Sequence, residues 1–308
     1  KRIFQMIIKI QLFIFQLIKS LLTLIKIIIL SDLFIKKIKI ERNHNEALIL
    51  GNGPSLKDFF KEENAFMENK TIFAVNYFAR TAEYKKVKPE FYVITSPEYF
   101  LNEQKEDYAN ERIITLKTIF KETVWPMVLI IPLIAKKNTH WKSHIIDNKM
   151  IHVHYMNTTP VEGFENISFH LISRQLGMPR PHNVLIPTIL HAINLDFRNI
   201  YVVGADHSWL SEIFVSKSNE VFLSQKHYYD DQTEKQNHSV NKPIPKPMYR
   251  GTSNEKRKLH EVLEKFAISF KSYWTLNAFA KSKNVKIWNC TENSFIDAFE
   301  KKSIKDEK

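Results

Sequence analysis

The first 40 residues of the chain are long apolar runs broken by single lysines, a pattern typical of an amphipathic helix. At about 100° per residue, the polar side chains fall within one arc of roughly 120°, and the remaining arc is apolar except for Gln11. The polar arc consists of Arg2, Lys9, Gln16, Lys19, Ser20, Thr23 and Lys26. The pattern predicts a helical segment within residues 1–45.

A membrane surface is the environment that best suits this helix. No uncharged window reaches the roughly 20 residues that a membrane span needs, and no small-residue cleavage site of a secretory signal follows it. Lysines along one edge of an apolar helix are typical of helices that lie in the plane of an anionic membrane surface. Docking on another subunit or on the chain's own core, and a true span, are the alternatives.

From residue 46 onward, short apolar runs closed by polar residues alternate with helical patterns. Strands are expected at 47–51, 71–75, 90–95, 112–116, 127–131, 150–154, 199–204 and 285–289, and helices at 183–195, 255–283 and 294–299. This alternation predicts a Rossmann-like α/β domain over residues 46–302, with a mostly parallel sheet and helices on both faces. The polar stretch at 211–250 predicts a long loop acting as a lid, and residues 303–308 form a polar tail.

Composition limits the partners. The 308 residues include 45 lysines and arginines against 33 acidic residues, a net charge of +12 that favours an anionic partner. The basic residues are spread out and no nucleic-acid-binding motif is present, so we expect no nucleic acid partner. The single cysteine, Cys290, excludes an internal disulfide and a multi-cysteine zinc site, and it favours a cytosol-facing protein.

The sequence Gly51-Asn52-Gly53-Pro54-Ser55 directly follows the first expected strand. Glycines let the backbone approach a ligand closely, and a serine in this position caps the helix that follows. Free N–H groups at that helix start would face the carboxyl ends of the strands, where phosphate binds well. The segment is neither a GxGxxG nor a Walker A motif. We predict a nucleotide-binding loop, and a plain strand-to-helix turn is the alternative.

Polar residues also stand at the ends of three other expected strands. They are Asn76, then Thr95 and Ser96, then Gly204, Asp206 and His207. The carboxyl ends of parallel strands face one crevice, where ligands bind in open α/β sheets. Amide and hydroxyl groups there suit a base, a ribose and a sugar. Each residue alone is also a common helix cap.

Two histidines are candidates for a catalytic base. His207 follows a strand, and His227 lies in the expected lid beside Tyr228 and Tyr229. A neutral imidazole takes a proton from an acceptor hydroxyl near pH 7, and tyrosines can donate hydrogen bonds to a leaving phosphate. We assign the base to His227. Asp206 is a candidate ribose ligand, metal ligand or cap, and we expect neither a metal site nor a bound cofactor.

The segments ALILGNGPSL, FAVNYFA, FYVITSPEYF and FRNIYVVGADHSW together resemble the bacterial sialyltransferases of glycosyltransferase family 42. They are equally similar to the wider group of domains related to archaeal 6-hydroxymethylpterin diphosphokinase, which includes flagellin-glycosylation proteins. The resemblance covers about residues 46–210, with gaps, and a segment near 285–299. It implies a single Rossmann-like domain of a GT-A-like variant.

The resemblance also implies roles for single residues. In the sialyltransferases the matching glycine loop, Asn76 and Ser96 would contact the cytidine nucleotide donor, and Asp206 would lie beside the cytidine. A loop histidine is the base in that family and tyrosines hold the donor phosphate. An arginine-x-threonine-serine segment of the family is replaced here by residues 180–183, which end in Asn183. We include Asn183 among the expected donor contacts.

These observations predict a metal-independent glycosyltransferase that uses a nucleotide-activated sugar, with a cytidine-linked, sialic-acid-like sugar as the specific expectation. Its acceptor would be a glycan or a lipid-linked glycan in lipopolysaccharide or capsule synthesis, at the cytoplasmic face of the inner membrane. The alternatives are a magnesium-dependent 6-hydroxymethylpterin diphosphokinase-like enzyme and a non-catalytic membrane-associated binding protein of the same fold.

Overall fold

A computed structural model of the protein describes residues 1–38, 44–62, 64–101, 106–224, 227–228, 245–250 and 255–307. Its described part contains an eight-stranded sheet of order β11-β10-β6-β1-β2-β3-β4-β5, in which all neighbouring strands are parallel. In chain order the strands are β1 (Glu46–Leu50), β2 (Thr71–Val75), β3 (Phe91–Val93), β4 (Met127–Pro132), β5 (Ile151–Met156), β6 (Asn199–Val203), β10 (Lys286–Asn289) and β11 (Glu300–Lys301). This arrangement confirms the predicted Rossmann-like α/β class.

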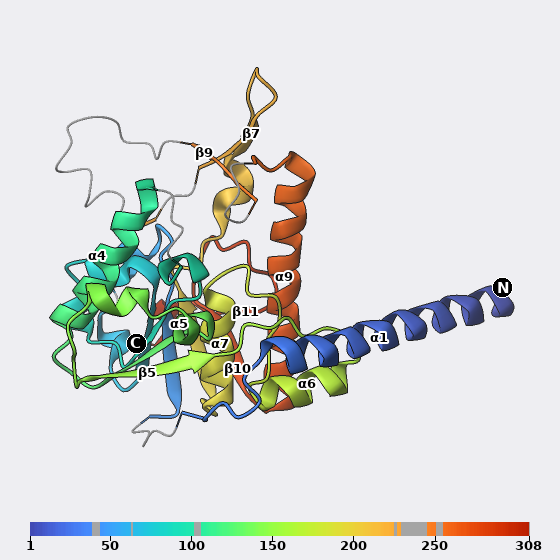
Figure 1. Ribbon diagram of the computed structural model, residues 1–308, viewed down its shortest axis with the longest axis horizontal. Helices are drawn as coiled ribbons and strands as arrows, with labels where there is room; N and C mark the ends of the chain where they lie inside the picture. The colour runs from blue at the N-terminus through green and yellow to red at the C-terminus, as the bar shows by residue number, and fades with distance from the viewer. Residues whose placement is uncertain are drawn as a thin grey trace.

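Helices cover both faces of the sheet (Figure 1). Ala47 and Ile49 of β1 belong to one buried cluster, whereas Leu48 and Leu50 belong to the other, as expected for a strand buried on both faces. The first face carries α6 (Glu165–Ser173), α7 (Leu185–Asn194) and α9 (Leu259–Ser282). The second carries α2 (Leu56–Glu62), α3 (Tyr84–Val87), α4 (Glu106–Glu122) and α5 (Ile134–Lys137).

The strand order reverses between β1 and β6. From β1 the chain continues through β2 to β5 on one side, whereas β6, β10 and β11 lie on the other. In open α/β sheets the crevice beyond such a switch point is the usual place for a ligand. The glycine loop after β1 and the polar turn after β6 therefore meet at this crevice.

Two expected elements are wrong. Residues 112–116 lie inside α4 rather than in a strand, because Leu116, Ile119 and Phe120 are buried at helical spacing against the sheet. Residues 294–299 form no helix, because the chain there is bound to the turn after β6: the Ser294 hydroxyl donates to Ala205 O and the Phe295 N–H donates to Asp206 O.

The segment expected as a lid contains a small antiparallel sheet of β7 (Ile213–Val215), β8 (Val221–Leu223) and β9 (Lys246–Pro247). Its apolar side packs on α9, where Val221 and Leu223 contact the cluster of Val262 and Phe266. The described part of this segment is therefore partly regular structure rather than a long loop. Residues 225–226 and 229–244 of the expected lid lie outside the described residues.

The long N-terminal helix α1 (Arg2–Leu30) uses its polar arc to bind the body of the protein. Ser20 and Thr23 are buried, and Thr23 both donates to Glu162 O (2.8 Å) and accepts from Glu162 N–H (3.0 Å). Gly163, at φ +114°, has room for no side chain, since a Cβ would lie 2.2 Å from Ser20 Oγ. The C-terminal part of the polar arc therefore docks on the chain's own body, which was one of the alternatives for this helix.

The apolar arc of α1 is exposed, and the N-terminal half of the helix projects away from the body (Figure 1). The helix has 29 residues and a mean hydropathy of 2.2 over its most apolar window, so by length and composition alone it could cross a membrane. Because Ser20, Thr23 and Ile27 face the body, the exposed apolar arc faces away from it along both halves of the helix.

Two neutral histidines in the core predict a pH-dependent stability. Burial lowers the pKa of His191 to about 3 and that of His154 to about 4. Unfolded histidines titrate near 6.5, so the unfolded chain binds more protons as the pH falls below that value. Each histidine then lowers the free energy of unfolding by up to about 1.4 kcal/mol for each pH unit between pH 6.5 and its pKa in the folded protein. Urea unfolding at pH 7.5 and 5.5 should show the loss.

His191→Leu should make the unfolding free energy less dependent on pH. The matched control is His170→Leu, which removes an exposed histidine from α6. If His191→Leu and His170→Leu keep the same pH dependence as the unmodified chain, the buried imidazole is not its source.

Candidate functional site

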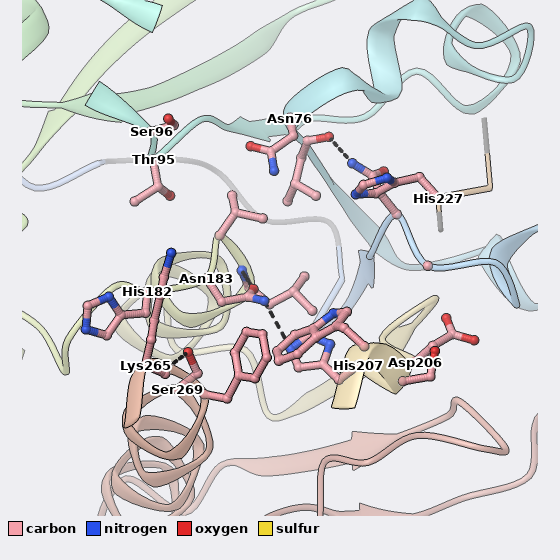
Figure 2. A pocket seen from close by; sticks show the side chains of 18 of the residues that line it. Asn76, Thr95, Ser96, His182, Asn183, Asp206, His207, His227, Lys265 and Ser269 are labelled. Carbon is pink, nitrogen blue, oxygen red and sulfur yellow. Dashed lines mark hydrogen bonds between the residues drawn. The ribbon is translucent and has the colours of Figure 1, made fainter. Parts of the chain in front are cut away.

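A cavity of about 420 Å³ opens at the carboxyl ends of β1, β2, β3 and β6 (Figure 2). Eleven of the residues predicted for the site line it: Asn52, Gly53, Pro54, Asn76, Thr95, Ser96, Asn183, Gly204, Asp206, His207 and His227. Gly51, Ser55 and Tyr228 are not among its lining residues, and Tyr229 lies outside the described residues. Side chains far apart in the sequence thus converge at the switch point of the sheet.

The glycine loop and the turn after β6 approach more closely than side chains allow. A Cβ on Gly51 would lie 2.3 Å from the carbonyl oxygen of Gly204, and a Cβ on Gly204 would lie 2.7 Å from that of Gly51. Gly204 also has φ +64°, in the left-handed region that favours glycine. These two glycines are therefore required by the packing of the two strand ends.

The donors of the glycine loop are already used within the protein. The Gly53 N–H donates to Gly204 O at 2.8 Å. Asp206 accepts from the Ser55 N–H at 3.3 Å and from the Ser55 hydroxyl at 2.8 Å, so its carboxylate lies at the start of α2. The expectation of free N–H groups is therefore wrong at Gly53 and Ser55, where a carbonyl and a carboxylate occupy the place proposed for a phosphate.

Burial raises the pKa of Asp206, and the two hydrogen bonds from Ser55 oppose this effect. The turn that carries this carboxylate is held from behind by the segment after β10. The Thr291 hydroxyl accepts from the Ala205 N–H at 3.0 Å, and the Phe295 N–H donates to Asp206 O at 3.0 Å. These contacts fix where the carboxylate enters the cavity.

His207 is a structural member of the cavity wall. Its Nε2 lies 3.1 Å from the Asn183 side-chain nitrogen and 2.7 Å from the Tyr273 hydroxyl. Burial lowers its pKa to about 3. Asn183 in turn caps α7, because its side-chain oxygen accepts from the Leu185 N–H at 2.8 Å. A buried imidazole bound in this way is poorly placed to accept a proton from a substrate.

His227 and Tyr228 point in different directions. His227 lines the cavity, across from His182 and Lys265 in the view of Figure 2. The Tyr228 N–H donates to Asn52 O at 3.1 Å, and its ring is buried against Phe60 and Phe78. Tyr228 therefore fastens this segment to the glycine loop, and the expectation that its side chain faces a donor phosphate is wrong.

Two buried oxygens that belong to cavity-lining residues have no hydrogen-bond partner in the described part of the chain. They are the Thr95 hydroxyl and the Asn52 side-chain carbonyl. Thr95 is only 8% exposed. Buried polar groups are rarely left unpaired, because each costs about 1–3 kcal/mol. These two groups have the character of ligand contacts that are not yet made.

No sequence pattern identified the wall that α9 contributes. Lys265, Phe266 and Ser269 line the cavity from this helix, and His182 lines it from the segment before α7 (Figure 2). They carry no local motif, and they reach the site because α9 packs on α7. The net positive charge was the one sequence signal that pointed toward such cations.

No protein-family model and no curated protein matches the chain. Among solved structures, it is similar to the MAf glycosyltransferase from Magnetospirillum magneticum AMB-1, with 13% sequence identity and a TM-score of 0.46. The similarity covers 88% of this chain and 35% of that chain, so this chain spans about a third of that protein's length. A similarity of this size does not identify a reaction, and the resemblance to family 42 stays a prediction.

Gly53→Ala should destabilise the strand-end contact. The added Cβ would lie 1.9 Å from Asp206 Oδ2 and 2.7 Å from Gly204 O. Such overpacking typically costs about 1–3 kcal/mol. Ser55→Ala removes one hydrogen bond without a clash and should cost about 1 kcal/mol. Urea unfolding measures both, and an unchanged stability of Gly53→Ala would show that Asp206 can move aside freely.

Proposed function

We propose that this protein is a glycosyltransferase that takes its sugar from a nucleotide-activated donor. The observation that carries the proposal is the set of neutral amide and hydroxyl side chains at the carboxyl ends of the strands. Among them are the buried oxygens of Thr95 and Asn52, which have no partner in the part of the chain that the structure describes. Such groups suit the hydroxyls of a ribose and a sugar. A cytidine-linked acidic sugar is the finer proposal, supported by the resemblance described above.

His227 is our choice for the base that takes the acceptor proton. It lines the cavity, whereas the imidazole of His207 is held by Asn183 and Tyr273. In a transfer with inversion, the acceptor oxygen bonds to the anomeric carbon as the bond to the nucleotide phosphate breaks. The acceptor proton then passes to His227, and the nucleotide leaves with the bonding electron pair.

We place the reaction at a membrane surface on the cytoplasmic side, with a glycan or lipid-linked acceptor. The apolar arc of α1 continues without a break past the part of the helix that docks on the body. If α1 spanned a membrane, the apolar arc of its docked part would face water. A membrane surface parallel to the helix axis would instead cover the apolar arc of the docked part and of the projecting part. This geometry favours a helix lying in the membrane surface.

A donor assay tests the proposed activity. The full chain is incubated in anionic vesicles with a panel of nucleotide sugars, and released nucleotide is measured with and without EDTA. We expect release from one nucleotide class, and release that survives EDTA supports a metal-independent reaction. Pyrophosphate transfer from ATP with magnesium to a pterin, without release from any nucleotide sugar, would contradict the proposal and favour a diphosphokinase.

His227→Ala should lower turnover by about 10²–10⁴-fold, the usual contribution of general acid–base catalysis, while donor affinity stays nearly unchanged. His207→Ala is the comparison, and it should lower the unfolding temperature because it removes a buried side chain bonded to Asn183 and Tyr273. Rates with the preferred donor and calorimetric titration measure the two effects. A loss of turnover in His207→Ala without a loss of stability would move the base to His207.

Substitutions on α1 test the membrane arrangement. Ile14 (48% exposed) lies in the projecting half and Ile25 (52% exposed) in the docked half, both on the side of the helix opposite Thr23. A helix in the membrane plane predicts that Ile14→Glu and Ile25→Glu each weaken vesicle binding about tenfold or more. Ile146→Glu, at an exposed apolar site outside α1, is the control. Flotation in which only Ile14→Glu loses binding would favour a span.

A further inference from the structure

The phosphate of a nucleotide cannot use the glycine loop in the usual way. The Gly53 N–H is bonded to Gly204 O, and the Ser55 N–H and hydroxyl are bonded to Asp206. A phosphate at that place would face the Asp206 carboxylate, and like charges repel strongly where water is excluded. The anionic group of a ligand must therefore bind elsewhere in the cavity.

Lys265 is the one lysine or arginine among the described residues that line the cavity. It extends from α9 into the cavity from the wall opposite Asp206 in the view of Figure 2. No carboxylate oxygen of a described residue lies within 4.0 Å of the Lys265 amine, so none of them forms an ion pair with it. Burial, together with the charge of Arg257, lowers the pKa of Lys265, and the charge of Glu98, which also lines the cavity, opposes this effect. A partly buried cation that has no ion-pair partner among the described residues is costly, and an anionic ligand reduces that cost.

His182 and Thr95 complete this wall. His182 lines the cavity, and its pKa is lowered by partial burial and by the charges of Lys265 and Arg180. The Thr95 hydroxyl is buried and has no partner among the described residues, so it is available as a donor. The cation of Lys265, the neutral imidazole of His182 and an unused hydroxyl all line one cavity, and together they suit a phosphate.

We infer that Lys265, His182 and Thr95 form the subsite that binds the phosphate of the nucleotide, on the α9 wall rather than at the glycine loop. The identity of the anion as a nucleotide phosphate rests on the proposed function. The nucleoside then lies toward Asn52 and Asn76, at the ends of β1 and β2. Lys265 stabilises the charge that develops on the phosphate as the sugar leaves.

The test is calorimetric titration of the full chain in vesicles with inorganic pyrophosphate. Lys265→Gln should weaken its binding about tenfold or more, because a charged hydrogen-bond donor is lost. Glu98→Gln should tighten it several-fold, because the charge that partly neutralises Lys265 is removed. Opposite effects of two cavity variants cannot come from misfolding. Lys271→Gln, exposed on the same helix, should bind as the unmodified chain does.

Three results would overturn the subsite: no pyrophosphate binding by the unmodified chain, equal binding by Lys265→Gln, or an equal loss in Lys271→Gln. The donor assay keeps this inference separate from the proposed function. Pyrophosphate binding that depends on Lys265, without use of any nucleotide sugar, retains the anion subsite and contradicts the transferase. If the protein uses a nucleotide sugar and Lys265→Gln binds that sugar donor with unchanged affinity, the proposed transferase is retained and the proposed subsite is contradicted.

Discussion

The contact between the ends of β1 and β6 is the constraint on which the site depends. The backbones of Gly51 and Gly204 approach so closely that neither position has space for a Cβ. Asp206 then binds Ser55 and the start of α2, which locks the two strand ends together. The cavity opens beside this contact, and the two strand ends cannot separate without breaking the partly buried hydrogen bonds to Asp206, each worth about 1.5–3 kcal/mol where the acceptor is charged.

This constraint separates two roles that a glycine loop often combines. In many nucleotide-binding folds such a loop brings backbone donors to a phosphate. Here the same shape brings the loop to its neighbouring turn, and an internal carboxylate accepts from Ser55. The positive charge needed for an anionic ligand is then supplied by side chains on another wall, above all Lys265. The chemistry is similar, but the elements that provide it have changed.

The sequence predicted the sheet well, because each central strand is a short apolar run buried on both faces. It failed at residues 112–116, where a short apolar run suggested a strand but Leu116, Ile119 and Phe120 are buried at helical spacing. It also identified the polar strand ends that converge in the cavity. It did not identify Lys265, because that residue reaches the cavity only through the packing of α9 on α7, and no local pattern records that packing.

A second set of polar contacts links α1 to the wall of the cavity. Thr23 of α1 is bonded to the backbone of Glu162, and the Glu162 carboxylate accepts two hydrogen bonds from Arg180, at 3.3 and 3.1 Å. Arg180 is followed directly by Pro181 and by residues 182–183, all of which line the cavity. A helix used only as a tether would need none of these polar contacts. The polar arc of α1 therefore has a structural role of its own, because it fixes the position of the cavity wall relative to the apolar arc that faces outward.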